Sequence, residues 1–195
     1  MLRRSFILST PGSILAIGLA VSGCTMTGST SDASGEQMDK RHSIDAGVDS
    51  TLGRLYNAAN GSRELVGKAR GVLVFPSVID AGFGVGGQYG EGALRIDGKN
   101  VAYYNITSAS VGLTLGLAKH REVILFMTQE VLDKFTTSHG WTIGADTGVA
   151  VLSKGAGGEY DTKTLQRPIL GIVFGEKGLI GDISLEGSKV TKLER

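Results

Sequence analysis

Six glycines are concentrated in a stretch of fourteen residues, AGFGVGGQYGEGAL (81–94), shortly after the apolar run GVLVFPSVI (71–79). Glycine has no side chain to pack and loses much backbone entropy on folding, so a strand tolerates it where close approach or unusual dihedral angles require it. The stretch therefore predicts bulges, sharp strand bends, or a surface that another backbone or a ligand approaches closely. Four of its glycines are candidates to line a groove for an acyl chain or a peptide strand, with tight packing of strand on strand as the alternative: Gly82, Gly84, Gly86 and Gly87.

The same stretch also fits the dinucleotide pattern G-x-G-x-x-G at residues 82–87. A nucleotide site of this kind needs a helix to begin there and to offer its N-terminal N–H groups to a pyrophosphate. The residues that follow include Gly90 and Gly92, and each glycine costs about 1 kcal/mol in a helix interior. Bent antiparallel strands are therefore expected instead of a nucleotide-binding turn.

Residues 1–23 are predicted to be an export signal. Arg3 and Arg4 supply the positive end, and an apolar stretch broken by Pro11 and Gly12 follows. The segment LAVSGC (19–24) resembles the bacterial lipobox, in which small residues precede a cysteine that becomes acylated. Cys24 is the single cysteine of the chain, which excludes an internal disulfide framework and makes Cys24 the expected lipid anchor.

The residue after the anchor is Thr25 and not aspartate. By resemblance to sorted lipoproteins, this favours attachment to the outer membrane with the domain facing the periplasm. The pair Arg3-Arg4 leaves both general secretion and twin-arginine export open. Without these two arginines the chain has a net charge of −1, which is unlike a protein that binds duplex nucleic acid.

Residues 24–40 are predicted to be a flexible tether, because they are rich in Ser, Thr, Gly and charge and have little to bury. Residues 41–195 are predicted to form one domain. Its first element is a helix over 43–59 with one apolar stripe, which suits either a membrane surface or a sheet; the mixed charges of its polar face favour the sheet. A second short helix is expected from Ser62, with Ser62 as its cap.

From residue 71 onward, strand-like runs alternate with turn signals, and Asp97-Gly98-Lys99-Asn100 is the clearest hairpin turn. A short helix is expected over 129–136. After the leader, no segment has about 18 unbroken apolar residues, so no membrane-spanning helix is expected. The predicted fold class is α+β, predominantly antiparallel β, as a twisted sheet or half-closed barrel with a few short helices.

Six segments, in order, resemble the SYLF domain and cover nearly all of residues 40–195. They are ARGVLVFPSVIDAGFGVGGQYGEG (69–92), YYNITSASVG (103–112), VILFMT (123–128), WTIGAD (141–146), GAGGEYDTKTL (155–165) and FGEKGLIGDISLEGSKVTKLER (174–195). In eukaryotic relatives this domain is associated with phosphoinositide-containing membranes and, in yeast members, with actin. The resemblance implies lipid binding; phosphoinositide and actin are not carried over directly, because a periplasm normally lacks both.

Enzyme activity is not expected, because G-x-S-x-G and S-x-x-K patterns of nucleophilic hydrolases are absent. The histidines His42, His120 and His139 are dispersed, without H-x-x-x-H or a carboxylate at metal-ligand spacing. They are interpreted as ordinary surface or core residues. No metal ion and no cofactor is expected.

Binding is the favoured class of function. The basic residues gather near the expected strand ends, where they suit the phosphates of anionic phospholipid or phosphoinositide-like head groups, or serve only as solvated surface charges. The candidates are Lys68, Arg70, Lys119, Arg121, Lys189, Lys192 and Arg195. The alternative is an envelope adaptor or structural protein that docks onto a protein partner by an exposed sheet edge.

Overall fold

The computed structural model describes residues 32–138, 140–144, 146, 148–152, 165–176, 178–180 and 185–194, with the backbone alone for residues 32, 33, 83, 84 and 110–116. The described helices are α1 (Asp32–Ala58), α2 (Ser62–Lys68) and α3 (Gln129–Thr137). The described strands are β1 (Gly71–Ile96), β2 (Lys99–Phe126), β3 (Trp141–Thr142), β4 (Ala150–Val151), β5 (Ile169–Gly175), β6 (Gly178–Leu179) and β7 (Lys189–Leu193).

Strands β1 and β2 form one long antiparallel hairpin, paired from Gly71 with Phe126 to Ile96 with Lys99. The connection is Asp97-Gly98, and both residues have positive φ, 48° and 76°. Two successive positive φ angles define the turn type whose twist matches paired strands, and Asp-Gly is a preferred sequence for it. The predicted hairpin turn is therefore confirmed.

The hairpin is interrupted by shifts of register, one of them between Phe83 and Val85. Beyond this point the second half of β1 packs against its own first half. A Cβ atom added to Gly92 would lie 2.0 Å from the carbonyl oxygen of Val74, and one added to Gly90 would lie 2.9 Å from that of Ser77. The expected bulge and close backbone approach are confirmed, but the approach is made by Gly90 and Gly92. No helix begins in this stretch, as expected.

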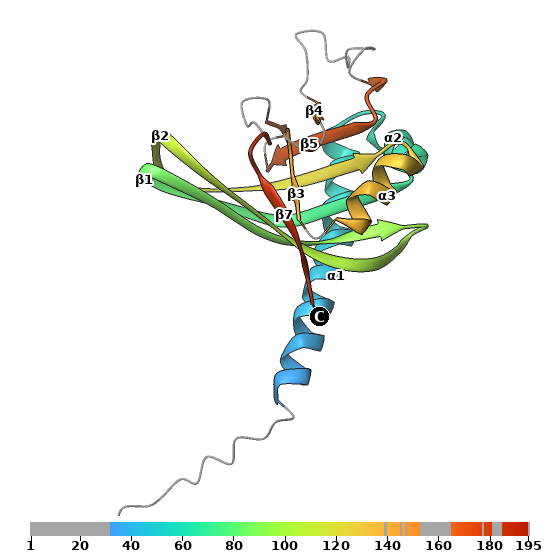
Figure 1. The fold of residues 1–195 in the computed structure, drawn as a ribbon, viewed down its shortest axis with the longest axis horizontal. Coiled ribbons are helices and arrows are strands. Elements are labelled where there is room, and N and C mark those ends of the chain that lie inside the picture. The colour runs from blue at the N-terminus through green and yellow to red at the C-terminus, as the bar shows by residue number, and fades with distance from the viewer. Residues whose placement is uncertain are drawn as a thin grey trace, which may run out of the picture.

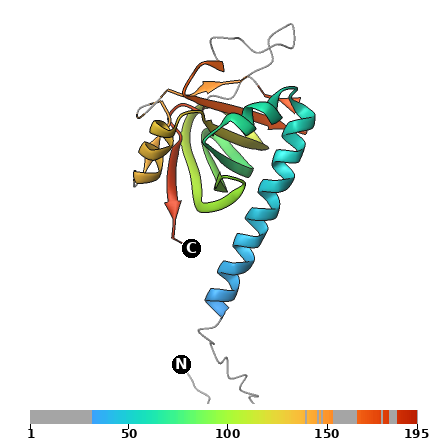
Figure 2. The same cartoon turned by 90° about the vertical axis from the view of Figure 1, so that its right-hand side faces the viewer.

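Strand β2 is central to a seven-stranded sheet. Its second half pairs with β5, and its first half pairs with β7, which in turn pairs with β3. Strand β4 adds to β5 in parallel, while all other pairs are antiparallel. The sheet is curled into a half-barrel, with α3 on one side and α1 on the other (Figures 1 and 2). The predicted α+β, mainly antiparallel architecture is confirmed.

Both faces of the middle of the sheet are buried, because successive side chains of a strand point to opposite faces. Leu73 and Phe75 belong to the apolar cluster inside the half-barrel, whereas Val72 and Val74 belong to the cluster beneath α1. Inside the half-barrel, the ring of Phe135 from α3 lies 4.7 Å from that of Phe126, centre to centre. Each face therefore receives its own helix.

Helix α1 packs on the sheet through most of the predicted apolar stripe: Ile44, Val48, Leu52 and Leu55 are buried, as is Ala59 just after the helix, whereas Tyr56 is half-buried. Packing against the sheet, the favoured alternative, is confirmed. The helix has 27 residues and begins at Asp32, so it includes residues 32–40, which the sequence analysis assigned to the tether. Lys40 pairs with Glu36 at 2.7 Å, one helical turn apart, which supports this exposed portion.

The predicted cap of α2 is wrong. Gly61, in the left-handed conformation, occupies the cap position, and the hydroxyl of Ser62 donates instead to the carbonyl oxygen of Leu55 at 3.2 Å. Gly61 suits this position because it adopts positive φ without a steric penalty. Among the described helices, none combines the length and the apolar character needed to cross a membrane.

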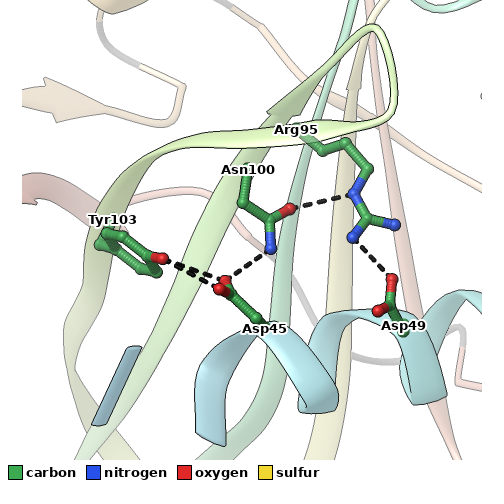
Figure 3. A network of polar contacts seen from close by, with 5 residues as sticks. All are labelled: Asp45, Asp49, Arg95, Asn100 and Tyr103. Atoms are coloured by element: carbon green, nitrogen blue, oxygen red, sulfur yellow. Dashed lines mark hydrogen bonds and ion pairs between the residues drawn. The ribbon is translucent and has the colours of Figure 1, made fainter. Parts of the chain in front are cut away.

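Polar contacts fix the angle between α1 and the hairpin (Figure 3). The carboxylate of Asp45 accepts hydrogen bonds from the Asn100 amide at 2.6 Å and from the Tyr103 hydroxyl at 3.1 Å. The guanidinium of Arg95 donates to Asp49 at 2.6 Å and to the Asn100 side-chain oxygen at 3.0 Å. Asn100 is the second residue of β2. It connects the two helix carboxylates, because it donates to Asp45 and accepts from the same Arg95 that donates to Asp49.

We expect Asp45→Ala to lower the free energy of unfolding by about 1–2 kcal/mol, because two donors at a half-buried position lose their acceptor. Asp49→Ala, the matched control, should cost less than about 1 kcal/mol, because the side chain of Asp49 is 67% exposed and its ion pair is solvated. Urea unfolding of the two variants measures the difference. Equal losses would contradict the assigned role of Asp45.

Candidate membrane-contact surface and neighbouring polar sites

Four apolar side chains are exposed around the bend of the long hairpin, and we call them the apolar bend surface. They are Leu117 (77% exposed), Val85 (67%), Tyr89 (49%) and Ile79 (43%). The labels β1 and β2 in Figure 1 stand on this part of the hairpin, which projects away from α1. Large exposed apolar side chains gathered on one projection are typical of contact with a membrane or another protein.

Strand alternation places these side chains outside. Ile79 pairs with Lys119, and Leu117 pairs with Ala81, so Ile79 and Leu117 are diagonal neighbours on the outer face. Further along β1, Val85 and Tyr89 are exposed, while Gly86 and Gln88 between them are buried. The glycine stretch thus has an inner face that packs and an outer face that remains uncovered.

A row of alternate residues leads along the outer face of β2 from this surface towards α1. It consists of Leu117, Lys119 and Arg121. Arg121 ends the row at a cleft of about 570 Å³ between α1 and the turn that joins β5 to β6. We call this the arginine cleft; its lining includes Arg54, Asn57, Arg121, Phe174, Glu176 and Gly178.

Two lysines on the short helices α2 and α3 pair with acidic neighbours. Lys68 bonds to Glu64 at 2.6 Å and Lys134 bonds to Glu130 at 2.8 Å, each one helical turn apart. These hydrogen bonds, together with the positive charge, lower the pKa of Glu64 and of Glu130. Such exposed ion pairs contribute little to stability, and these lysines belong to solvent-exposed faces of the helices. Within the described part of the chain, Arg54 and Arg121 make no comparable ion pair.

The inside of the bent hairpin holds a buried polar cluster, which we call the polar clasp. The ring of His120 lies between two carboxylates, with Nδ1 2.9 Å from Asp80 and Nε2 2.7 Å from Glu122. The amide of Gln88 donates to the same Glu122 oxygen at 2.7 Å, and the hydroxyl of Ser108 donates to Gln88 at 3.3 Å. His120 is 2% exposed and Glu122 is fully buried.

The two ring nitrogens of His120 differ in their contacts. Nε2 is hydrogen-bonded to Glu122 at 2.7 Å, whereas Nδ1 lies 2.9 Å from Asp80 but does not meet the geometry of a hydrogen bond. The clasp also ties the hairpin together, because His120 and Glu122 lie in the second half of β2, after the bend, while Ser108 lies in its first half and pairs with Gln88 in the second half of β1. No group of side chains among the described residues is arranged to hold a metal ion.

His120 is a core residue, one of the two alternatives expected for the histidines, but its carboxylate contacts were not predicted. Asp80 lies some forty residues before His120, and Gln88 lies 34 residues before Glu122, so local spacing gave no signal for them. The one local clue was Glu122, two residues after His120 and therefore on the same face of a strand. His42 is exposed on α1, and His139 lies outside the described residues.

The predicted basic residues do not form one surface. Lys119 and Arg121 share the outer face of β2, but Arg70 precedes β1 opposite Phe126, roughly 16 Å further along the strand. Lys189 and Lys192 are three residues apart on β7, so strand alternation directs them to opposite faces. Arg195 and the proposed anchor Cys24 lie outside the described residues.

The groove candidates Gly82, Gly84, Gly86 and Gly87 lie within β1 at the bend. A Cβ atom added to Gly87 would be 3.6 Å from its nearest neighbour, an ordinary contact. The arginine cleft is lined by other residues. Their role as a ligand groove stays a prediction. Arg54 was not among the predicted site residues. Its place on the polar face of α1 gives no sign of the cleft, which exists only where α1 meets the sheet.

Comparison with known proteins gives one match. The model of a family described as Ysc84, "Las17-binding protein actin regulator", matches residues 107–194. This is the family that the six sequence segments indicated. No curated protein matches the chain. The matched residues include Lys119, Arg121 and His120, whereas α1 and β1 precede them.

Proposed function

Since residues 107–194 belong to the Ysc84 (SYLF) family, we propose that this chain is a non-catalytic, lipid-anchored domain that binds anionic phospholipid through its apolar bend surface. The acylated Cys24 would hold it to the bacterial envelope, at the periplasmic face of the outer membrane. The domain would then make a second, reversible contact with the bilayer. The exposure of the apolar bend surface carries this proposal.

Two physical terms support a membrane as the partner. Burying an apolar side chain of this size is favourable by about 1.5–3 kcal/mol, and a basic residue near an anionic surface adds about 1 kcal/mol. Leu117, Val85 and Ile79 supply the first term, and Lys119 beside Ile79 supplies the second. Their sum is typical of weak peripheral binding, which an acyl anchor would strengthen by raising the local concentration.

The test is flotation of the chain on vesicles, with Cys24→Ser to remove the acyl group. We expect binding to vesicles that contain phosphatidylglycerol, weakening as salt rises, and at least a tenfold loss of affinity in Leu117→Asp. Val101→Asp is the matched control, because Val101 is also apolar and 55% exposed but lies near the other end of the hairpin. Equal loss in both variants, or no vesicle binding, would overturn the proposal.

A protein partner is the second candidate, because the matching family is described by its binding of another protein. The chain would then be an envelope adaptor, and the same apolar bend surface would contact a protein. Chemical cross-linking in cells distinguishes a protein partner from a membrane partner. A defined cross-linked partner that is lost in Leu117→Asp, together with no vesicle binding in vitro, would favour the adaptor.

A further inference from the structure

The arginine cleft brings together two guanidinium groups from distant parts of the chain. Arg54 comes from the last turns of α1, and Arg121 comes from the second half of β2 opposite Phe174 of β5. Arg54 is exposed, whereas Arg121 is half-buried beside the fully packed ring of Phe174. Neither guanidinium makes an ion pair among the described residues, and the one carboxylate of the described lining, Glu176, leaves an excess of positive charge that attracts an anion.

The donors of the cleft suit a phosphate group. Guanidinium groups present parallel N–H donors that match two phosphate oxygens at once, and partial burial strengthens the contact. The Asn57 side chain at the same rim offers a further N–H donor. Gly175 and Gly178 line the opposite wall.

Glu176 adds an acceptor to the cleft. A carboxylate repels a second phosphate but accepts hydrogen bonds from hydroxyl groups. With Arg54 and Arg121 it leaves the described lining with one net positive charge. The lining therefore matches one phosphate ester that carries neighbouring hydroxyl groups, such as a phosphoglycerol or a sugar phosphate.

The cleft is continuous with the apolar bend surface. From Arg121 the outer row of β2 passes Lys119 and reaches Leu117, about 13 Å along the strand. A head-group phosphate held at Arg121 would thus lie a short distance from the side chains proposed to enter the bilayer. The arginine cleft would then contact the phosphate layer of the leaflet, and the apolar bend surface would enter its hydrocarbon layer.

We propose that the arginine cleft binds a hydroxyl-bearing phosphate ester, with Arg54 and Arg121 holding the phosphate and Glu176 accepting from its hydroxyl groups. If the ester is a lipid head group, this inference rests on the membrane binding proposed above and names its ligand. A soluble sugar phosphate would use the same chemistry without a membrane.

The experiment compares two double variants of equal charge, each in the chain with Cys24→Ser. Arg54→Gln with Arg121→Gln removes the cleft cations. Lys99→Gln with Arg167→Gln removes two exposed basic residues elsewhere that make no ion pair among the described residues. Affinity is measured for phosphatidylglycerol vesicles by flotation and for glycerol 3-phosphate by calorimetry, with inorganic phosphate as the probe that lacks hydroxyl groups.

We expect the cleft pair to lose at least tenfold in affinity and the control pair less than threefold. Glycerol 3-phosphate should bind more tightly than inorganic phosphate, and Glu176→Gln should reduce that preference. Equal losses of affinity in the two double variants would contradict the proposed phosphate site in the cleft and leave the proposed membrane binding intact. Loss of glycerol 3-phosphate binding in the cleft pair, when vesicles are not bound at all, would support the cleft with a soluble ligand and reject the membrane function.

Arg121 is half-buried, so its replacement by glutamine is checked for folding by thermal unfolding. Arg121→Lys is the second variant, because lysine keeps the stem and the charge but has no fork of donors. It should fold as the unmodified chain does and still lose several-fold in affinity for glycerol 3-phosphate. Full affinity in Arg121→Lys, with a loss in the glutamine pair, would show that charge alone acts there and would contradict the proposed paired contact.

Discussion

Replacing Gly92 by alanine should lower the free energy of unfolding by about 3 kcal/mol or more. The added methyl group would lie 2.0 Å from the carbonyl oxygen of Val74 and 2.7 Å from the ring of Phe75. A carbonyl oxygen belongs to the backbone and cannot turn away, so the two halves of β1 would have to separate. Overpacking in a well-packed core typically costs about 1–3 kcal/mol, and here the obstacle is backbone.

Gly87→Ala is the matched control for this prediction. Gly87 lies in the same strand and the same glycine stretch, but an added Cβ would meet nothing closer than 3.6 Å. We expect the control to change stability by less than about 1 kcal/mol in urea unfolding. A neutral Gly92→Ala, or equal losses at both positions, would contradict the packing of β1 against itself.

The second large effect is expected at the polar clasp. His120→Leu should lower the free energy of unfolding by about 3 kcal/mol, because it leaves the buried carboxylate of Glu122 without its hydrogen bond to the imidazole. The remaining donor would be the Gln88 amide at 2.7 Å, and the other Glu122 oxygen has no hydrogen-bond partner. Asp80→Asn should cost less, because the side chain of Asp80 is 25% exposed and is partly solvated.

The double variant His120→Leu with Glu122→Leu is the control, because it removes both charges and replaces them with apolar groups. Buried ion pairs exchanged for well-packed apolar residues are often close to neutral in stability. Because the double variant leaves neither partner of this buried contact unsatisfied, we expect it to be more stable than His120→Leu alone, and a double-mutant cycle measures the coupling. Simple additivity of the two losses would mean that the groups do not interact as the geometry indicates.

The elements that local sequence determines were predictable. Asp97-Gly98 has the residues that a two-residue hairpin turn needs, and the structure places the turn there. The apolar spacing of α1 predicted its buried stripe, because a helix repeats every 3.6 residues whatever lies against it. The glycine density at 81–94 also indicated close packing, although the partner backbone proved to be β1 itself.

The parts that depend on distant partners were not predictable from one sequence. The polar clasp joins His120 to Asp80 and Glu122 to Gln88. Asp80 approaches through the pairing of β1 with β2, whereas Gln88 approaches only after the hairpin has bent. The arginine cleft likewise needs Arg54 of α1 beside Arg121 of β2. Sequence proximity was misleading at Lys189 and Lys192, because neighbouring basic residues on a strand need not share a face.

The nested pairing of β1 with β2 also determines how this chain can assemble. Pairing can start at Ile96 and Lys99, beside the turn, and proceed stepwise to Gly71 and Phe126, so no long loop has to close at once. Hairpins of this kind form from local contacts, which fold quickly, and β5 and β7 can then add to the two halves of β2. The segment 107–194 that carries the family pattern begins within β2, after the turn. In this order of assembly, the segment that matches the family model pairs with a strand and a turn that lie ahead of it in the chain.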